Sequence, residues 1–398
     1  MINLVKRYMN EITSILQFLV LFCVSVPFMI FAVYGTIILY YNKVKRNRIK
    51  RNFDDENIQY EPSVSVVVPT HNEKSIISKR IENLLNSSYP KEKLEIIFVD
   101  DSTDSTSEII KEYSKKNPYI HLLRFNRRMG YSPSLIAGCK AAKGEIIVFA
   151  EASSFLESDT IHNLVRNFRN PEIGAVTGKD MLLNMNEEMG QLENSYLKLL
   201  DFVRLGESNM DSTVYMKGEA AAVRKSLIED LDKLNAPGTA DTAIALFVRS
   251  KGYRFIFDPD VKFYEYSPSS REGRIKQKTI RAANLIKVIW SFRSLFFKRR
   301  YGKFGSIILP FNFAMLVIAP IFILAAAISL VTLTFFEPML SLIFWSIIGS
   351  ALAIGLVFSK KVVITFFEFE FSLLKAFYEV VFVRKSHDKI DKVASTRR

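Results

Sequence analysis

The chain has 398 residues, of which 49% are hydrophobic and 24% are charged. This composition excludes an intrinsically disordered protein, a coiled coil and a collagen-like fibre. The mean hydropathy is positive, +0.11, and 32 residues are Phe, which favours membrane segments. The chain has 2 cysteines, Cys23 and Cys139, and 4 histidines, so a disulfide framework and a Cys/His zinc site are excluded.

The net charge of +13 indicates binding either to nucleic acid or to an anionic membrane. Residues 12–41 contain no charged side chain and exceed the roughly 20 residues that cross a bilayer, which predicts an N-terminal transmembrane helix. The stretch is also too long for the apolar part of a secretory signal. Residues 42–60 form a basic juxtamembrane linker, which places that end of the helix in the cytoplasm. Membrane topology therefore explains the charge, and we expect no nucleic-acid partner.

Two further apolar stretches, 304–336 and 338–359, are separated by a predicted external turn at Glu337-Pro338. We expect residues 304–359 to form a transmembrane hairpin. In residues 360–398, an apolar stretch at 362–383 carries four charges, which disfavours a lipid-exposed span. An interfacial or re-entrant helix with a basic tail is favoured there, and a fourth span is the alternative. The sequence thus predicts a multi-pass protein of the plasma membrane, in contact with the lipid bilayer.

Residues 61–270 have the pattern of an α/β domain. Apolar, β-branched runs alternate with stretches of helical spacing. The runs predict strands at 64–68, 94–99, 121–125 and 145–150. Helices are predicted at 75–85, from the loop after the second strand to 116, and at 134–142. This alternation implies a mostly parallel sheet with helices on both faces. Ligands in such sheets bind beyond the carboxyl ends of the strands, where Glu73, Asp100, Asp101 and Glu151 fall. No dinucleotide fingerprint or Walker sequence is present, which argues against a dehydrogenase or an NTPase.

Four motifs in this domain carry a resemblance to a known family. They are Ser65 to Glu73 (SVVVPTHNE), Phe98 to Thr106 (FVDDSTDST), Gly144 to Ser154 (GEIIVFAEASS) and Gly238 to Thr242 (GTADT). In this order they resemble the family 2 glycosyltransferases of the Rossmann-like GT-A fold, over residues 60–285. The flanking spans resemble those of hyaluronan, chitin and cellulose synthases. The resemblance implies inverting transfer of a sugar from a UDP- or GDP-sugar donor, with the catalytic domain in the cytoplasm.

The first two motifs imply donor-binding residues. By the family pattern, Pro69, Thr70 and Glu73 line the end of the first strand. Asp101 would accept a hydrogen bond from an N–H of a uracil ring. For Glu73 and Asp101 the alternative is that the carboxylate caps the helix that follows it.

The third motif stands where the family has Asp-x-Asp, which coordinates a divalent cation that bridges the diphosphate. Glu151 keeps one carboxylate, whereas Ser153 offers only a hydroxyl. Glu151 is therefore the implied ligand of Mg²⁺ or Mn²⁺, and Ser153 the second donor-binding residue of the loop. Because one carboxylate is a poor cage, we expect weaker metal binding than with two aspartates.

The acceptor side is implied by later residues. Asp241 matches the last acid of the family's Thr-Glu-Asp motif and is the candidate general base, while a carboxylate favoured by a helix N-terminus is the alternative. Gly218 would allow close approach of the acceptor sugar, although a simple bulge explains it equally well.

We expect residues 271–303 to form an amphipathic interface helix region. Compared with the family's Gln-x-x-Arg-Trp motif, Lys278 stands in place of the Gln, and Arg281 matches the Arg. These two cations would hold the diphosphate and compensate for the weaker metal site. Snorkelling from an amphipathic helix is the alternative for both side chains.

The expected acceptor is a lipid-linked glycan or a growing polysaccharide. Replacement of the family's stacking Trp by Ala282 favours the lipid-linked acceptor. A second hypothesis also stands, because Ser153, Ala240 and Ala282 all depart from the family motifs. The chain would then be a catalytically silent nucleotide-binding membrane scaffold that partners an active enzyme.

Overall fold

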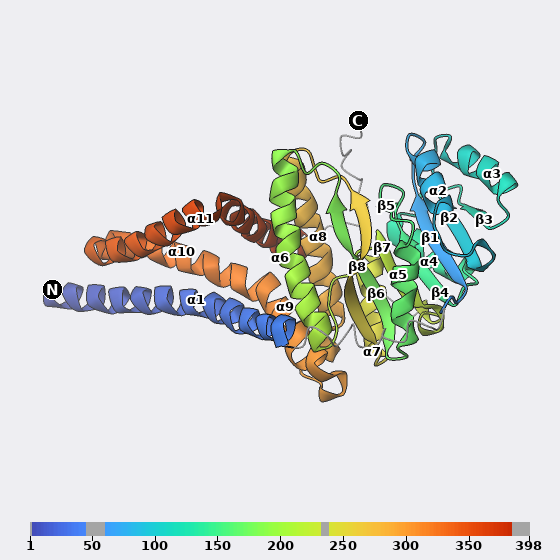
Figure 1. Ribbon diagram of the computed structural model, residues 1–398. Helices are drawn as coiled ribbons and strands as arrows, with labels where there is room; N and C mark the ends of the chain where they lie inside the picture. The colour runs from blue at the N-terminus through green and yellow to red at the C-terminus, as the bar shows by residue number, and fades with distance from the viewer. Residues whose placement is uncertain (1, 45–59, 232–238, 384–398) are drawn as a thin grey trace.

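The computed structural model describes residues 2–44, 60–231 and 239–383. A domain built on one sheet occupies one end of the molecule, and helices α1 (Ile2–Val44), α10 (Ala319–Phe336) and α11 (Pro338–Tyr378) project from it to one side (Figure 1). Most of the predicted basic linker and the basic tail from 384 lie outside the described residues, as does Gly238 of the fourth motif.

The domain contains an 8-stranded sheet in the order β3-β2-β1-β4-β7-β6-β8-β5. Its strands are β1 (Val64–Thr70), β2 (Leu94–Asp100), β3 (Ile120–Arg124), β4 (Ile146–Ala150), β5 (Phe155–Leu156), β6 (Ile173–Leu182), β7 (Ala220–Arg224) and β8 (Arg254–Glu265). Strands β1 to β4 are mutually parallel, β7 is antiparallel to both of its neighbours, and β6 and β8 pair in parallel. The predicted α/β fold with a mostly parallel sheet is confirmed. Thr70 pairs with Asp100 at the carboxyl edge, so the first two motifs end side by side.

Helices cover both faces of the sheet because each buried strand presents apolar side chains to both sides. Helices α2 (Ile77–Leu85), α3 (Thr106–Lys116) and α5 (Thr160–Val165) contribute to one core with Val66 and Val68. Helices α4 (Tyr131–Ala141) and α7 (Ala240–Ser250) contribute to a second core with Val67 and Ile97. Alternate residues of one strand therefore fill opposite cores.

One of the predicted boundaries moves. The helix expected from 134 begins at Tyr131, directly after Gly130 at φ 85°. Strand β7 begins at Ala220, so Gly218 lies in the turn that leads into it.

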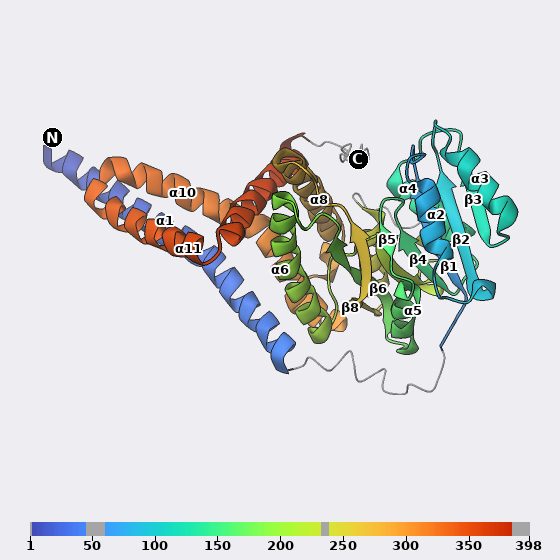
Figure 2. The ribbon, with the colours of Figure 1, turned by 45° about the horizontal axis from the view of Figure 1, so that its top comes forward.

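Three helical segments among the described residues are long and apolar enough to cross a membrane, judged by length and composition alone: Arg7–Val44, Phe304–Phe336 and Pro338–Val357. They agree with the predicted limits to within a few residues at most ends. The second segment contains α9 (Leu309–Phe313), α10 and two π-helical turns. In both views α1, α10 and the first part of α11 run side by side (Figure 2).

The segment after residue 360 is helical and follows a kink in α11, and its interfacial or re-entrant placement stays a prediction. Helix α11 has one non-helical residue, Ser359, and then turns back toward α6 (Glu188–Met210) and α8 (Arg271–Ser291). Leu373 and Ala376 of this second part are fully buried in a core that includes Ala283 and Ile286 of α8. Helix α8, which was predicted to be amphipathic, also packs into the protein, because its apolar residues Ala283 and Ile286 belong to this same core.

Charged groups fasten this second part of α11 to the domain. Glu368 accepts hydrogen bonds from Arg274 and, at 2.6 Å, from Arg271. Arg274 is fully buried and also donates to Glu193 of α6, at 2.8 Å. Three helices are thus joined by one buried ion-pair network.

We predict that Glu368→Ala lowers the thermal unfolding temperature clearly, since it leaves the buried Arg274 guanidinium short of one carboxylate. Breaking a buried pair costs on the order of 3 kcal/mol. The measurement is thermal unfolding of the full chain in detergent. Glu272→Ala, at an exposed position of the same helix α8, is the control and should unfold like the wild type. Equal unfolding temperatures for both variants would contradict the role of the network.

Candidate functional site

The two adjacent aspartates after β2 have different partners. Asp100 is fully buried, and its carboxylate accepts hydrogen bonds from the Thr70 hydroxyl at 2.8 Å and from Arg124 at 2.7 Å. The hydroxyls of Ser102 and Ser107 donate to the same carboxylate. Since Thr70 and Arg124 belong to β1 and β3, Asp100 joins the ends of three parallel strands and has a structural role.

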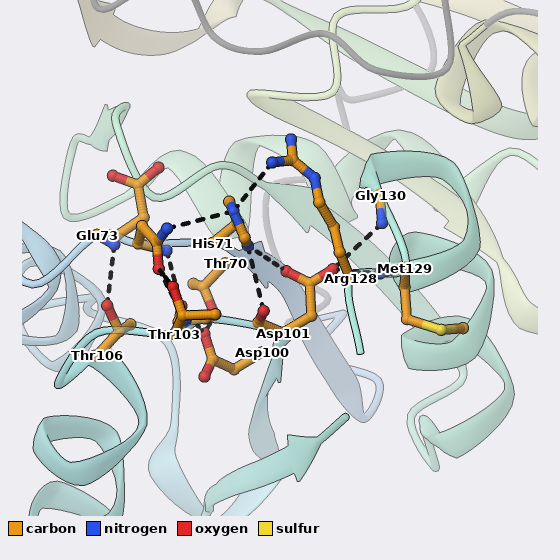
Figure 3. A network of polar contacts seen from close by, with 12 residues as sticks. Thr70, His71, Glu73, Asp100, Asp101, Thr103, Thr106, Arg128, Met129 and Gly130 are labelled. Carbon is orange, nitrogen blue, oxygen red and sulfur yellow. Dashed lines mark hydrogen bonds and ion pairs between the residues drawn. The ribbon is translucent and has the colours of Figure 1, made fainter. Parts of the chain in front are cut away.

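Asp101 reaches in another direction, toward the segment that precedes α4 (Figure 3). Its Oδ1 is 2.7 Å from Nδ1 of His71, and its Oδ2 accepts hydrogen bonds from the backbone N–H groups of Met129, at 2.6 Å, and Gly130, at 3.1 Å. Both oxygens therefore already have donors. The predicted contact with a nucleotide base stays a prediction, and a base would have to share these oxygens.

The other residues predicted for the donor side lie at the same edge. Pro69 lies in β1 and pairs with Val99 of β2, and the Thr70 hydroxyl donates its hydrogen bond to Asp100. Glu73 is 2% exposed, and its backbone N–H donates to the Thr106 hydroxyl at 2.9 Å. Figure 3 shows the Glu73 carboxylate directed away from Asp100 and Asp101. The first two motifs are thus brought together, with most of their polar groups already engaged within the protein.

A second group forms around Asp241, at the start of α7. Its carboxylate accepts hydrogen bonds from the backbone N–H groups of Gly218, at 3.1 Å, and Thr242, at 2.7 Å. The pKa of Asp241 is raised to about 7, chiefly by burial; the backbone N–H of Thr242 opposes this shift, and the nearby carboxylates of Glu219 and Glu151 favour it. A carboxyl group with a pKa near neutrality is suited to accept a proton.

Contacts at Glu151 and Glu219 connect two further segments of the chain to the group around Asp241. The hydroxyl of Ser154 donates to the backbone oxygen of Glu151 at 3.2 Å and lies 3.4 Å from that of Glu219. Arg281 of α8 lies 3.5 Å from the Glu219 carboxylate. Four of the predicted residues therefore gather in one region: Glu151, Gly218, Asp241 and Arg281. Ser153 directly precedes Ser154 in the chain.

Gly218 is explained by the protein's own side chains. A Cβ atom built there would collide with the hydroxyl of Tyr131 and stand 3.0 Å from Oδ2 of Asp241. The space that the sequence assigned to an approaching sugar is therefore filled by Tyr131, which lies at the start of α4. Burial raises the pKa of the Tyr131 phenol well above its usual value, and Asp241, Glu151 and Glu219 act in the same direction. The Tyr131 phenol thus lies near three carboxylates.

Lys278 does not join either group. Its Nζ lies 3.0 Å from Glu193 and 3.2 Å from the centre of the Tyr196 ring, both on α6. Burial lowers the pKa of Lys278 to about 7 even with Glu193 beside it. The Lys278 head group is enclosed between α6 and α8, so its contact with a diphosphate and the snorkelling alternative both stay predictions.

Sequence reasoning missed Glu219 and gave no role to Tyr131. Glu219 follows Gly218 directly, so its place beside a predicted acceptor residue was a usable signal. No local sequence pattern connects Tyr131 with Gly218. That contact depends on how α4 and the turn before β7 pack.

A metal ion would depend on Glu151. Among the residues that the structure describes, no group of three or more His, Cys, Asp or Glu side chains is arranged to hold a metal. Glu151 thus offers a single carboxylate, and the site fits a cation only if a bound ligand supplies the remaining oxygen atoms.

We predict that Gly218→Ala destabilises the protein by about 1–3 kcal/mol, the usual scale for overpacking. The added methyl group meets the Tyr131 hydroxyl. Removing that hydroxyl in the double variant Gly218→Ala/Tyr131→Phe should restore part of the loss, measured by thermal unfolding. If Tyr131→Phe gives no recovery, the contact between these two residues does not determine the need for glycine.

Comparison with known proteins agrees with this geometry. Residues 65–232 match the family described as Glycosyl transferase family 2. The probable glycosyltransferase YdaM of Bacillus subtilis (strain 168) is 29% identical over 327 residues, which cover 78% of this chain and 75% of that protein. The poly-beta-1,6-N-acetyl-D-glucosamine synthase of Staphylococcus aureus (strain COL) is 24% identical, over 71% of this chain and 68% of that protein.

Among solved structures, a mannosyltransferase of Pyrobaculum calidifontis, PcManGT, in complex with GDP-Man and Mn²⁺, has a similar fold. The TM-score is 0.70 at 24% sequence identity, and the alignment covers 91% of this chain and 99% of that one. The sheet, the four ordered motifs and these relatives together identify a family 2 glycosyltransferase domain of the GT-A fold in this chain, which is a glycosyltransferase.

Proposed function

We propose that the protein transfers a sugar, with inversion, from a UDP- or GDP-sugar to an acceptor held at the cytoplasmic face of the plasma membrane. The observation that carries the proposal is Asp241, a buried carboxylate with a pKa of about 7 at the centre of the family motifs. A family 2 domain supplies the reaction class, and Asp241 supplies a group able to take the proton that the acceptor hydroxyl loses.

In this reaction the acceptor oxygen attacks the anomeric carbon from the face opposite the nucleotide. The bond from that carbon to the diphosphate oxygen breaks, and the hydroxyl proton passes to Asp241. The two backbone N–H groups that hold the carboxylate orient it. Tyr131 limits the space over Gly218.

The leaving diphosphate needs positive charge. Arg281 is the predicted cation on this side, and its contact with Glu219 holds the guanidinium near the reacting centre. A divalent cation bound by Glu151 and the donor diphosphate would act as a Lewis acid for the leaving group. The solved relative PcManGT, which contains GDP-Man and Mn²⁺, supports this assignment.

The acceptor is the lipid-linked glycan or growing polysaccharide expected from the sequence. Three apolar helices that are long enough to cross a bilayer support a membrane location. One relative is named as a synthase of poly-beta-1,6-N-acetyl-D-glucosamine, which supports a glycan acceptor. Hydrolysis or transfer of a nucleotide sugar by the purified protein separates this function from the silent scaffold.

We predict that Asp241→Asn lowers the transfer rate by about 10²–10⁴-fold, the usual contribution of a general base, and leaves nucleotide binding nearly unchanged. The wild-type rate should rise with pH to a plateau, with a midpoint near 7, because the base acts when deprotonated. The measurements are initial rates against pH and calorimetric titration with UDP and GDP. Asp230→Asn, at an exposed position, is the control.

The same pKa has a consequence for stability. Because the folded pKa of about 7 lies above the ordinary 3.8, the folded state binds the proton more tightly, and the contribution of Asp241 to stability falls as the pH rises from about 4 to 7. Asp241→Asn should remove this slope.

An Asn variant that keeps more than about a tenth of the wild-type rate would contradict the role of Asp241 as the base.

We predict that a chelator lowers activity and that Ser153→Asp reduces the Mg²⁺ or Mn²⁺ concentration needed for half-maximal rate. A second carboxylate beside Glu151 would restore the two-acid site. Calorimetric titration of Mn²⁺ in the presence of UDP or GDP gives a second readout, in which Ser153→Asp should bind the metal more tightly. Ser153→Ala serves as the control for loss of the hydroxyl. Full activity in excess chelator would exclude a catalytic role for a metal at Glu151.

A further inference from the structure

A chain of hydrogen bonds leads from the interior to the surface at the carboxyl edge of the sheet. It begins at Asp101, which is 5% exposed, and passes through the His71 ring. The other ring nitrogen, Nε2, lies 3.1 Å from a guanidinium nitrogen of Arg128, which is exposed. Figure 3 shows His71 between the two, with Arg128 extending away from Asp101.

The partners of the ring assign its hydrogen atom. The Asp101 carboxylate can only accept, so Nδ1 carries the hydrogen and donates it. Arg128 can only donate, so Nε2 uses its lone pair. The amide of Asn72 agrees, because its oxygen accepts the backbone N–H of Thr103 at 2.8 Å and its nitrogen is left to face Nε2 at 3.3 Å. His71 is therefore a neutral imidazole fixed in one orientation.

Asp101 also fixes the backbone on which Arg128 stands. Its second oxygen binds the N–H groups of Met129 and Gly130, the two residues that follow Arg128. One buried carboxylate thus controls both the start of this side chain, through the backbone, and its end, through His71. Holding a long cationic side chain in one place reduces the entropy that it loses when it binds a ligand.

We propose that Arg128 is a binding residue for the diphosphate of the nucleotide donor and that His71 is its positioning residue. The proposal rests on the proposed function, because the donor is a nucleotide sugar. Arg128 stands at the edge where the two donor-side motifs end, and a guanidinium matches the geometry of phosphate oxygens. It takes over part of the role that the sequence assigned to Lys278, whose head group is enclosed by Glu193 and Tyr196.

The test measures binding of UDP and GDP, with Mg²⁺ present, to the full chain in detergent by calorimetry. Arg128→Gln should weaken binding of the nucleoside diphosphate by about ten- to hundredfold, the scale for a hydrogen bond to a charged group. Arg127→Gln is the matched control, since Arg127 is the exposed neighbour in sequence and should bind like the wild type. Binding of the nucleosides, which lack phosphates, should not change in Arg128→Gln.

His71→Phe keeps a ring and removes both nitrogen atoms. It should weaken diphosphate binding by about the same factor as Arg128→Gln, and the double variant should bind no more weakly than either single variant. A merely structural role for His71 would give additive losses. Thermal unfolding of each variant shows whether the fold is kept, and Arg128→Gln, at an exposed position, tests the binding role independently of His71.

Each outcome decides a separate claim. Equal binding by Arg128→Gln and Arg127→Gln would overturn the assignment of Arg128, and an equal loss for nucleosides would overturn its assignment to the diphosphate. Additive losses in the double variant would overturn the positioning role of His71. If the wild-type protein binds neither UDP nor GDP, the proposed function itself fails, which is a result distinct from the other three.

Discussion

Burial of carboxylates is the constraint on which this structure depends. A carboxylate that leaves water must receive hydrogen-bond donors or opposite charges, or it takes up a proton. Asp100 has three hydroxyls and Arg124, and Asp101 has His71 and two backbone N–H groups. Asp241 has two backbone N–H groups but also two acidic neighbours, and its pKa reaches about 7. Unequal compensation separates Asp100 and Asp101, which hold the fold, from Asp241, which can exchange a proton near neutral pH.

The same rule joins the domain to the apolar helices. Glu207 of α6 accepts hydrogen bonds from Tyr34 of α1 and Asn312 of α9, both at 2.6 Å. Glu368 of α11 is paired with Arg271 and Arg274 of α8. In both places a carboxylate shielded from water can be satisfied only if the helices keep their relative positions. The polar contacts therefore give the orientation, while the apolar cores around them provide most of the stabilisation.

How much could be predicted from the sequence depended on the range of the interactions. The strands at β1, β2 and β4 are apolar runs buried on both faces, so their pattern is local and was readable. The grouping of the motifs followed from the carboxyl edge of a parallel sheet. The pairing of Lys278 with Glu193 could not be predicted, because Glu193 comes from a helix that is distant in the sequence. The contact between Gly218 and Tyr131 was likewise set by packing of separate elements, and no spacing in the chain encodes it.

The segment between Thr213 and Glu219 connects the apolar helices with the reacting centre. At one end the Thr213 hydroxyl donates to Glu207 at 2.7 Å, on the carboxylate that Tyr34 and Asn312 also bind. At the other end Gly218 holds Asp241 and Glu219 contacts Arg281. Because only a few residues separate these two anchors, a displacement of α1 or α9 relative to the domain would pull on the turn that orients the base. This connection keeps Asp241, the proposed base, at a fixed position relative to the three apolar helices.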